Sequence, residues 1–464
     1  MNPAQILPGL RPAASILFIR LRSLGDILLS TPLYAALKAW RPDLQLSALV
    51  EEPYQELLLR NPDLKHVFSV PSSENPPYQG GKAPQALGGV PLEDAVQFIE
   101  GHPPAPPSKG GIVHFHALWR RFGGVGNSSE NPPSRRGGSP WAAGGVFGLS
   151  RRDIPLQRGN CPFSSAVAAQ PVMKNSSGRT ALSLLAARMA VLRRIRLEGF
   201  DCCINLHGGS TSGWFTWLSR ATYRVGLRNF RHRFCYNVRI ELKPKSGLES
   251  KQHTVEHQMR WLHSLGMPEA AISPLQVFPD PGVESRVEAR LMQQGIDPTA
   301  SYCVIQPTSK FYTKEWIPRG FAEIADYLGT QFGYRTVLTG GPGEMQKLKC
   351  VADNCQTAPA ILNEISISEL MWVIKRAKLF IGNDSGPTHL AAAFNIPIIV
   401  LFGSSDSEVW HPWKVIHQVV QNPFECNPCP GYRCLVYEEP KCILSITTSQ
   451  VKQAIERLLA DRCP

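Results

Sequence analysis

The chain has 464 residues, which is long enough for two domains, and 43% of its residues are apolar, so sizeable cores can form. The net charge of +12 suggests an anionic partner: nucleic acid, a phosphorylated ligand or an acidic membrane surface. The apolar stretch at residues 13–19 is too brief for a secretory signal, and no stretch reaches the roughly 18 apolar residues that span a bilayer. We therefore expect a cytoplasmic protein whose twelve cysteines are mostly reduced thiols.

The first part of the chain alternates between strand and helix patterns. Short apolar runs rich in β-branched residues indicate buried strands, and apolar residues at helical spacing indicate helices. Strands are expected at residues 15–19, 45–50, 67–70 and 202–207, with helices at 27–40, just after residue 50 and at 181–197.

Residues 72–180 interrupt this alternation with a stretch crowded with Pro, Gly and Ser, in which the hexapeptide SSENPP occurs twice. The stretch holds 11 Lys and Arg against 6 Asp and Glu, so it carries +5 of the net charge. A loop this long inside a compact domain predicts an inserted, largely disordered segment.

A second alternation follows the first. Strands are expected at residues 302–306, 335–339, 379–382 and 396–402, with helices between them. Alternation of this kind predicts an α/β protein with two doubly wound, Rossmann-like domains that face each other across a cleft. The expected parts are a first domain at 1–71 and 181–280, the insertion at 72–180, a second domain at 281–445 and a C-terminal helix at 446–464.

Asp26 stands in the stretch RLRSLGDILLSTP, where the first strand gives way to a helix. Ligands of open parallel sheets bind at the carboxyl ends of the strands, so this carboxylate is a candidate functional group. The alternative is that Asp26 only caps the helix, because a side-chain oxygen there accepts backbone N–H groups. The stretch alone leaves both interpretations open.

The strongest local motif is IGNDSGPTHLAAA, at residues 381–393. A buried strand ends before Asp384 and Ser385, Gly386 lets the backbone approach closely, and a helix begins near Pro387. Exposed N–H groups and the positive dipole end at such a helix start suit a diphosphate. An ordinary capped helix with His389 packed on its flank is the alternative.

Two other turns follow strands of the same domain. In IQPTSKFYTKEW, Thr308 and Ser309 offer hydroxyl groups, while Lys310 and Lys314 can neutralise phosphate oxygens. In the turn GGPGE, at residues 340–344, the Glu344 carboxylate could accept hydrogen bonds from ribose hydroxyls. No G-x-G-x-x-G follows a strand and no Walker sequence occurs, which argues against dinucleotide redox chemistry and P-loop hydrolysis.

The first domain contains a basic stretch, RVGLRNFRHRF, at residues 224–234. Its arginines could recognise an acidic ligand, or they could belong to a solvated loop. Just before it, Trp214, Phe215, Trp217 and Leu218 form an apolar helix face, which we interpret as core rather than membrane contact.

Four cysteines near the C-terminus have C-x2-C-x4-C-x7-C spacing: Cys426, Cys429, Cys434 and Cys442. Four thiolates could hold zinc or an iron–sulfur cluster. The later spacing is irregular for a zinc ribbon, however, so a loop of reduced cysteines is the favoured interpretation.

Together these motifs resemble the ADP-heptose heptosyltransferases of lipopolysaccharide core assembly, which have the GT-B fold. RLRSLGDILLSTP is similar to the N-terminal signature of that family, and IGNDSGPTHLAAA with the following IPIIVLFGSSD is similar to its C-terminal signature. IQPTSKFYTKEW resembles heptosyltransferase III, while the cysteine-rich loop resembles heptosyltransferase II. The resemblance covers residues 14–70 and 180–462, leaves the subtype open, and implies an inverting transfer without metal or other cofactor.

The resemblance also implies roles for individual residues. Asp26 matches the general base, Asp384 the acid that contacts the heptose, and the remaining matches belong to the donor diphosphate, the nucleotide or the acceptor. The expected donor-binding residues are Thr308, Ser309, Lys314, Glu344, Asp384, Ser385, Gly386, Pro387 and His389. The expected acceptor-binding residues are Arg20, Arg22, Arg228, Arg231 and Arg233.

The implied partners are ADP-heptose, a lipid A–core acceptor and the inner leaflet of the cytoplasmic membrane, where the protein would be peripheral. Two alternatives remain: a GT-B transferase that uses another nucleotide sugar, and a catalytically silent protein that binds a nucleotide sugar or glycolipid. Nucleic acid is not an expected partner, because much of the charge lies in the insertion and no nucleic-acid module is recognisable.

Overall fold

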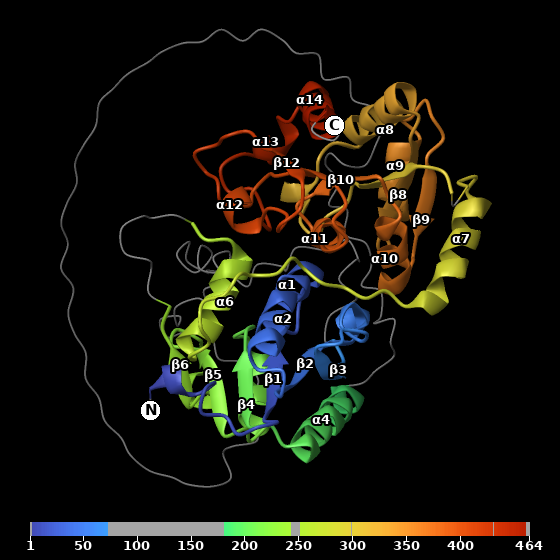
Figure 1. Cartoon of the computed structure of the whole chain (residues 1–464). Coiled ribbons are helices and arrows are strands. Elements are labelled where there is room, and N and C mark those ends of the chain that lie inside the picture. Colours follow the sequence, from blue (N-terminus) through green and yellow to red (C-terminus); the bar gives the residue numbers. More distant parts are fainter. Residues whose placement is uncertain (1, 73–180, 243–250, 298, 430, 461–464) are drawn as a thin grey trace, which may run out of the picture. The chain divides into compact units, whose positions relative to one another are not determined.

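The computed structural model describes residues 2–72, 181–242, 251–297, 299–429 and 431–460. All but the first residue of the expected insertion at 72–180 therefore lies outside the described residues. The described chain forms two six-stranded sheets in which all paired strands are parallel (Figure 1). This confirms the predicted α/β class with two doubly wound, Rossmann-like sheets.

The first sheet has the strand order β3-β2-β1-β4-β5-β6. Its strands are β1 (Ser15–Ile19), β2 (Gln45–Glu51), β3 (Leu64–Val70), β4 (Cys202–Asn205), β5 (Tyr223–Leu227) and β6 (Val238–Ile240). Its helices are α1 (Leu24–Leu28), α2 (Thr31–Trp40), α4 (Ala181–Glu198), α5 (Ser210–Leu218) and α6 (Thr254–Ser264), with 3-10 turns η1 (Pro3–Gln5), η2 (Glu52–Leu57) and η4 (Arg233–Cys235).

The second sheet repeats this topology in the order β12-β11-β10-β7-β8-β9. Its strands are β7 (Tyr302–Gln306), β8 (Arg335–Gly340), β9 (Ala360–Asn363), β10 (Leu379–Asn383), β11 (Ile398–Leu401) and β12 (His417–Val420). Its helices are α7 (Glu284–Gln293), α8 (Pro318–Phe332), α9 (Met345–Ala352), α10 (Ile367–Lys375), α11 (Gly386–Ala393), α12 (Ser407–Trp410), α13 (Lys441–Leu444) and α14 (Thr448–Ala460), with 3-10 turns η5 (Pro281–Val283) and η6 (Tyr312–Lys314).

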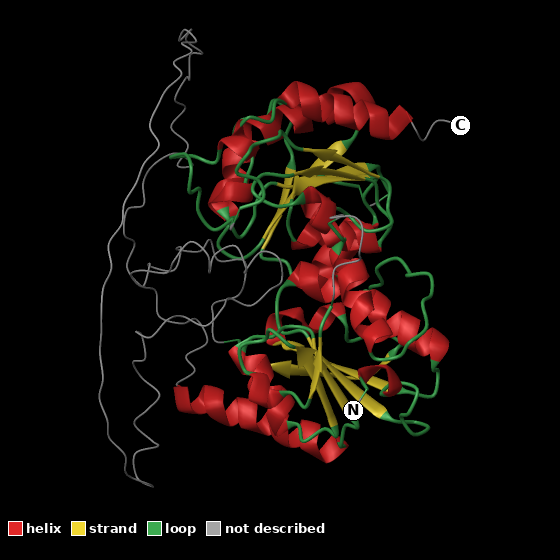
Figure 2. Cartoon of the chain, turned by 90° about the vertical axis from the view of Figure 1, so that its left-hand side faces the viewer, coloured by secondary structure: helices red, strands yellow, loops and turns green. Residues whose placement is uncertain are grey.

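Helices cover both faces of each sheet (Figure 2), so the central strands are buried throughout, as β1, β7 and β10 are. On one face of the first sheet, α4 and α5 pack through Leu192 and Phe215. A continuous apolar cluster covers the opposite face and extends to one face of the second sheet. In the described parts of the chain, no helix is long and apolar enough to cross a membrane.

The strands that differ most from expectation are short or carry polar residues. β4 ends two residues early, at Asn205, because the Asn205 side chain accepts the N–H groups of His207 and Gly208 and turns the chain away. β11 is shorter than predicted at both ends, whereas β3 begins at Leu64 rather than at residue 67. The sequence did not predict β5, β6, β9 and β12, and the basic stretch at 224–234 contains most of β5.

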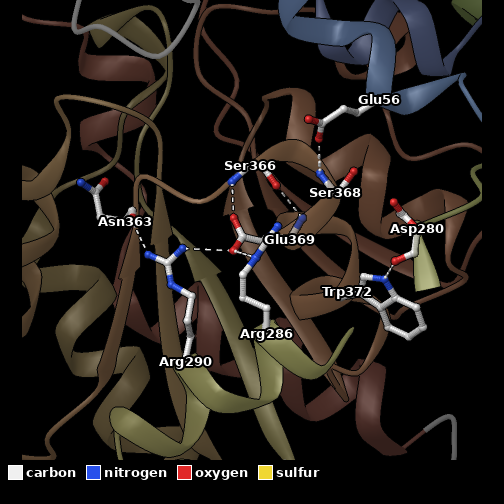
Figure 3. A network of polar contacts seen from close by, with 9 residues as sticks. All are labelled: Glu56, Asp280, Arg286, Arg290, Asn363, Ser366, Ser368, Glu369 and Trp372. Atoms are coloured by element: carbon white, nitrogen blue, oxygen red, sulfur yellow. Dashed lines mark hydrogen bonds and ion pairs between the residues drawn. The ribbon is translucent and has the colours of Figure 1, made fainter. Parts of the chain in front are cut away.

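A polar network joins η2, which follows β2, to the helices of the second sheet (Figure 3). The Glu56 carboxylate accepts the N–H of Ser368 at 2.7 Å, in the first turn of α10. Glu369, in the same turn, is paired with Arg286 and Arg290 at 2.9 and 3.2 Å. Carboxylates at the start of a helix interact favourably with the helix dipole. This network therefore holds α10 against η2 on one side and α7 on the other.

His253 connects the start of α6 to the segment after α12. Its Nδ1 accepts the N–H of Val255, its Nε2 hydrogen-bonds the carbonyl of His411 at 2.9 Å, and its ring stacks on Trp413. Acceptance at Nδ1 needs a neutral imidazole, whose proton is then on Nε2 and is donated to the carbonyl of His411. Burial lowers the pKa of His253 to about 3, so the ring stays neutral well below its ordinary pKa of 6.5.

We expect the free energy of unfolding to fall as the pH drops below 6.5. The imidazole of His253 is then protonated in the unfolded chain, whereas in the folded chain it stays neutral because it is buried. The contribution of His253 is complete above pH 6.5 and is reduced by about 2 kcal/mol at about pH 5. Chemical denaturation at several pH values measures this slope. His253→Asn keeps a capping acceptor and should flatten the slope, whereas His263→Asn, a partly exposed ring on the same helix, should not. An unchanged slope in His253→Asn would contradict the assignment.

Candidate active site

The candidate residues lie at the point in each sheet where the strand order reverses. In the first sheet, β1 pairs with β4, and Asp26 and His207 follow these two strands. In the second sheet, β7 pairs with β10, and Thr308 and Asp384 follow them. Crevices at the carboxyl ends of strands at such switch points are where doubly wound sheets bind ligands.

Asp26 uses its two carboxylate oxygens differently. Oδ1 accepts a hydrogen bond from Arg20, whose guanidinium also donates to the carbonyl of Leu206 at 2.5 Å. Oδ2 accepts the backbone N–H and the hydroxyl of Ser23, at 3.3 and 3.2 Å. The capping interpretation therefore holds for one oxygen, while an ion pair holds the other.

Opposing effects set the pKa of Asp26. Burial alone raises it, but the charge of Arg20 and the hydrogen bonds from Arg20 and Ser23 outweigh burial, so the pKa lies below its ordinary value of 3.8. Asp26 is therefore an ionised carboxylate at neutral pH. Its side chain keeps 24% of its surface exposed, which leaves it accessible to a ligand.

His207 is a site residue that the sequence analysis did not single out. Burial, and then the charges of Arg20 and Arg22, lower its pKa to about 4 despite the opposing effect of Asp26. His207 is thus a neutral imidazole at neutral pH whose pKa responds to the charge of Asp26. The sequence signal was available, because a polar residue directly after a buried strand marks the ligand-binding edge of a parallel sheet.

In the second sheet, Lys314 and Asp384 form an ion pair with an N–O distance of 2.7 Å, across 70 residues of sequence. The Ser405 hydroxyl donates to the same oxygen of Asp384 at 2.6 Å. Burial raises the pKa of Asp384, but Lys314 and Ser405 lower it more, so its pKa falls below the ordinary value. An ammonium has three N–H donors, so Lys314 can bind Asp384 and still reach a further anion.

Thr308 and Glu344 belong to one buried network. The Thr308 hydroxyl donates to Glu344 Oε2 and accepts from Gln306, both at 2.7 Å. Glu344 Oε2 also accepts the N–H of Gly341 at 2.7 Å. Burial raises the pKa of Glu344 above its ordinary value. The neighbouring Ser309 is fixed through its backbone N–H, which donates to Glu315 at 2.9 Å.

The start of α11 contains two buried polar atoms without a partner in the described residues, Ser385 Oγ and His389 Nδ1. Ser385 is the N-cap, Gly386 and Pro387 follow in the first turn, and His389 is 4% exposed. Burial lowers the pKa of His389 and keeps the ring neutral. Buried polar atoms of this kind at a helix N-terminus are suited to hydrogen-bond an anion.

Helices α1 and α11 approach each other closely because each has a glycine at the contact. A Cβ on Gly25 would lie 2.7 Å from the ring of His389, and a Cβ on Gly386 would lie 2.8 Å from the Cβ of Leu24. The charges of Asp384 and Asp26 both act to raise the pKa of His389, against the larger effect of burial. This contact thus brings together the two switch points.

The five expected acceptor-binding arginines have different surroundings. Arg20 pairs with Asp26, whereas Arg22 pairs with Glu51 at 2.7 Å. Arg228 is exposed and pairs with Glu241 at 3.0 Å, and the side chains of Arg231 and Arg233 are exposed. The loop that carries these last three packs beside the end of β4, since the Phe230 ring contacts Gly208.

The cysteine loop packs on η6, the turn that carries Lys314. The N–H of Cys434 donates to the Tyr312 hydroxyl at 2.9 Å, and the Thr313 hydroxyl donates to the carbonyl of Gly431. A cavity of about 20 Å³ is lined in part by Cys426, Cys429, Cys434 and Cys442. Among the described residues, no three His, Cys, Asp or Glu side chains are arranged to hold a metal ion. The two hydrogen bonds tie the loop to η6.

Comparisons with known proteins show which family the chain is similar to. The sequence model of glycosyltransferase family 9 (heptosyltransferase) matches residues 188–438, more than half of the chain. Lipopolysaccharide heptosyltransferase 3 of Escherichia coli is 32% identical over 232 residues, which span 48% of this chain and 65% of that protein.

Solved structures share the fold. The glycosyl transferase family 9 structure from Veillonella parvula DSM 2008 has a TM-score of 0.64 at 19% identity and covers 99% of each chain. The structure of Escherichia coli ADP-heptose lps heptosyltransferase II has a TM-score of 0.59 at 15% identity, covering 97% of this chain and 99% of the other.

We expect Gly25→Ala to lower the free energy of unfolding by about 1–3 kcal/mol, because the new methyl group overpacks against the buried ring of His389. Alanine is otherwise the better helix former, so the opposite sign would hold in an open helix. Gly282→Ala is the matched control, since its Cβ would meet nothing closer than 3.4 Å. Chemical denaturation measures both variants, and a Gly25→Ala protein as stable as the parent would refute the close contact.

Proposed function

The chain belongs to glycosyltransferase family 9 (heptosyltransferase), and on this premise we propose that it moves heptose from ADP-heptose to the inner core of lipopolysaccharide. The observation that carries the proposal is the meeting of the two switch points at His389, with an ionised carboxylate on each side. A reaction that joins a nucleotide sugar to a second sugar needs two such half-sites in contact.

Asp26 is proposed to be the general base of an inverting, single displacement. A sugar hydroxyl is a weak nucleophile at neutral pH, and a positioned base accelerates such a reaction by roughly 10²–10⁴-fold. The acceptor hydroxyl gives its proton to Asp26 while its oxygen bonds to the anomeric carbon of the heptose. The bond from that carbon to the phosphate oxygen breaks on the opposite side, and ADP leaves.

Residues of the second sheet are proposed to hold the donor. Negative charge develops on the leaving ADP, and Lys314 with the positive end of α11 stabilises it in place. The unpartnered Ser385 hydroxyl and His389 imidazole support this assignment, because each can bond a phosphate oxygen. Thr308, Ser309, Gly386 and Pro387 shape the phosphate site, Asp384 contacts the heptose hydroxyls, and Glu344 accepts from the ribose.

The first sheet is proposed to bind the lipid A–core acceptor. Arg228, Arg231 and Arg233 offer cations to phosphate or acidic sugar groups, as do Arg20 and Arg22 nearer to Asp26. In this proposal residues 1–71 and 181–280 form the acceptor domain, 281–445 the donor domain and 446–464 a C-terminal helix. The enzyme acts in the cytoplasm, as a peripheral protein at the inner leaflet of the cytoplasmic membrane.

The decisive experiment measures ADP release from ADP-heptose with a panel of truncated lipopolysaccharide acceptors. We expect release that depends on the acceptor, and a fall of at least about 100-fold in Asp26→Asn, because the base is lost while donor binding persists. Asp353→Asn, an exposed carboxylate at the end of α9, is the matched control and should leave the rate unchanged.

Other outcomes of this experiment contradict the proposal in different ways. Tight binding of ADP-heptose without release to any acceptor would indicate a silent binding protein. No binding of ADP-heptose would redirect the search to other nucleotide sugars. Full activity in Asp26→Asn would remove Asp26 from the role of base.

The acidic limb of the pH profile tests the role of Arg20. Because Arg20 lowers the pKa of Asp26, Arg20→Gln should raise that pKa and move the acidic limb of kcat to higher pH. Arg22→Gln removes a neighbouring charge that pairs with Glu51, so it should leave the position of the limb unchanged. A limb that stays in place in Arg20→Gln would show that Asp26 does not set it.

A further inference from the structure

The first sheet presents a cluster of exposed aromatic rings. Trp214 and Trp217 on α5 contact each other and Phe234 of η4, with ring centroids 5.6, 5.6 and 6.3 Å apart. These side chains are 45%, 44% and 54% exposed, whereas Phe215 on the opposite side of α5 is 6% exposed. The expectation that the whole apolar face of this helix is core is therefore wrong for the two tryptophans.

Positive charge surrounds the aromatic cluster. Residues 210–242 contain six arginines and a single acidic residue, Glu241, which pairs with Arg228. Arg233 lies beside Phe234 in η4, Arg231 precedes this turn, and Arg220 follows the end of α5; all three are exposed. Among the described residues, Arg220, Arg231 and Arg233 have no ion pair, and exposed rings beside such cations are suited to a partner that is apolar within and anionic at its surface.

Helix α4 carries a separate exposed apolar stripe. Both α4 and α5 pack on the same face of the sheet, and Arg196 near the end of α4 donates to the carbonyl of Leu218 at 2.7 Å. On its outer side α4 exposes Leu182, Leu185 and Met189, by 79%, 57% and 49%. Their spacing of three and four residues places them on one stripe of the helix.

We propose that the aromatic–basic face, formed by Trp214, Trp217, Phe234, Arg231 and Arg233, docks on the surface of an anionic lipid bilayer. Tryptophan rings settle at the headgroup level of a membrane, and arginines there meet the lipid phosphates. A second copy of the chain is a poorer occupant, because two such faces would bring like charges together.

Docking on this face would orient the enzyme toward its acceptor. This step rests on the proposed function, because it assumes that the same bilayer holds the acceptor. Helix α5 begins three residues after His207, whose pKa responds to the charge of Asp26, and Trp214 is about 6 Å along the helix from its first residue. A lipid-anchored sugar emerging next to the aromatic rings would therefore reach Asp26 without leaving the membrane surface.

Vesicle flotation tests the proposal with the full chain. We expect the protein to float with vesicles of phosphatidylcholine mixed with phosphatidylglycerol, and to do so less with phosphatidylcholine alone or in high salt. The double variant Trp214→Ser/Trp217→Ser should bind the mixed vesicles at least about tenfold more weakly. Phe332→Ser removes an exposed aromatic residue from α8 and should bind like the parent.

An activity assay separates this proposal from the proposed function. The double variant should keep parental ADP release with a lipid-free, soluble acceptor, and lose it selectively with acceptor embedded in vesicles. Vesicle binding by the double variant equal to that of the parent would overturn the proposal, as would a parent that never floats. Sedimentation showing a lipid-independent dimer that the tryptophan changes dissolve would assign the face to a second copy. Normal flotation without transfer to any acceptor would instead refute the function alone.

Discussion

The close approach of α1 to α11 is the contact on which the candidate site depends. Each sheet alone ends in a half-site, with Asp26 after β1 and Asp384 after β10. Gly25 and Gly386 remove the two side-chain carbons that would hold the helices apart, and His389 fills the space between them. Packed interiors tolerate little extra volume. A side chain at either glycine would therefore push the two helices, and with them the two half-sites, apart.

Buried charge in this centre is neutralised pair by pair. Arg20 pairs with Asp26 and Lys314 with Asp384, and each cation lowers a pKa that burial alone would raise. Removing one partner of such a pair leaves a costly unpaired charge. The two carboxylates are therefore ionised at neutral pH, while the imidazoles of His207 and His389 between and beside them stay neutral.

The sequence predicted the central elements well because their patterns are local. β1 and β7 are uninterrupted apolar runs, and the expected bounds of β1 match the structure. β6 and β12 were missed because an edge strand needs only partial burial, so residues such as Arg239 and His417 break the apolar pattern. Among the site residues, Asp26 and Asp384 were recognisable from their turns. The ion pair of Asp384 was not, because nothing local links Lys314 to a carboxylate 70 residues away.

The ion pair between Lys314 and Asp384 has a consequence for selectivity. Lys314 is paired with Asp384 within the protein, so a small free anion that approaches Lys314 meets a largely compensated positive charge. The charge of such an anion alone would therefore contribute little to its binding free energy. A ligand gains affinity by adding contacts that the internal carboxylate cannot mimic, such as bonds to Ser385 and His389. In the proposed donor site, contacts that depend on the shape of the ligand would therefore add to the attraction of its charge.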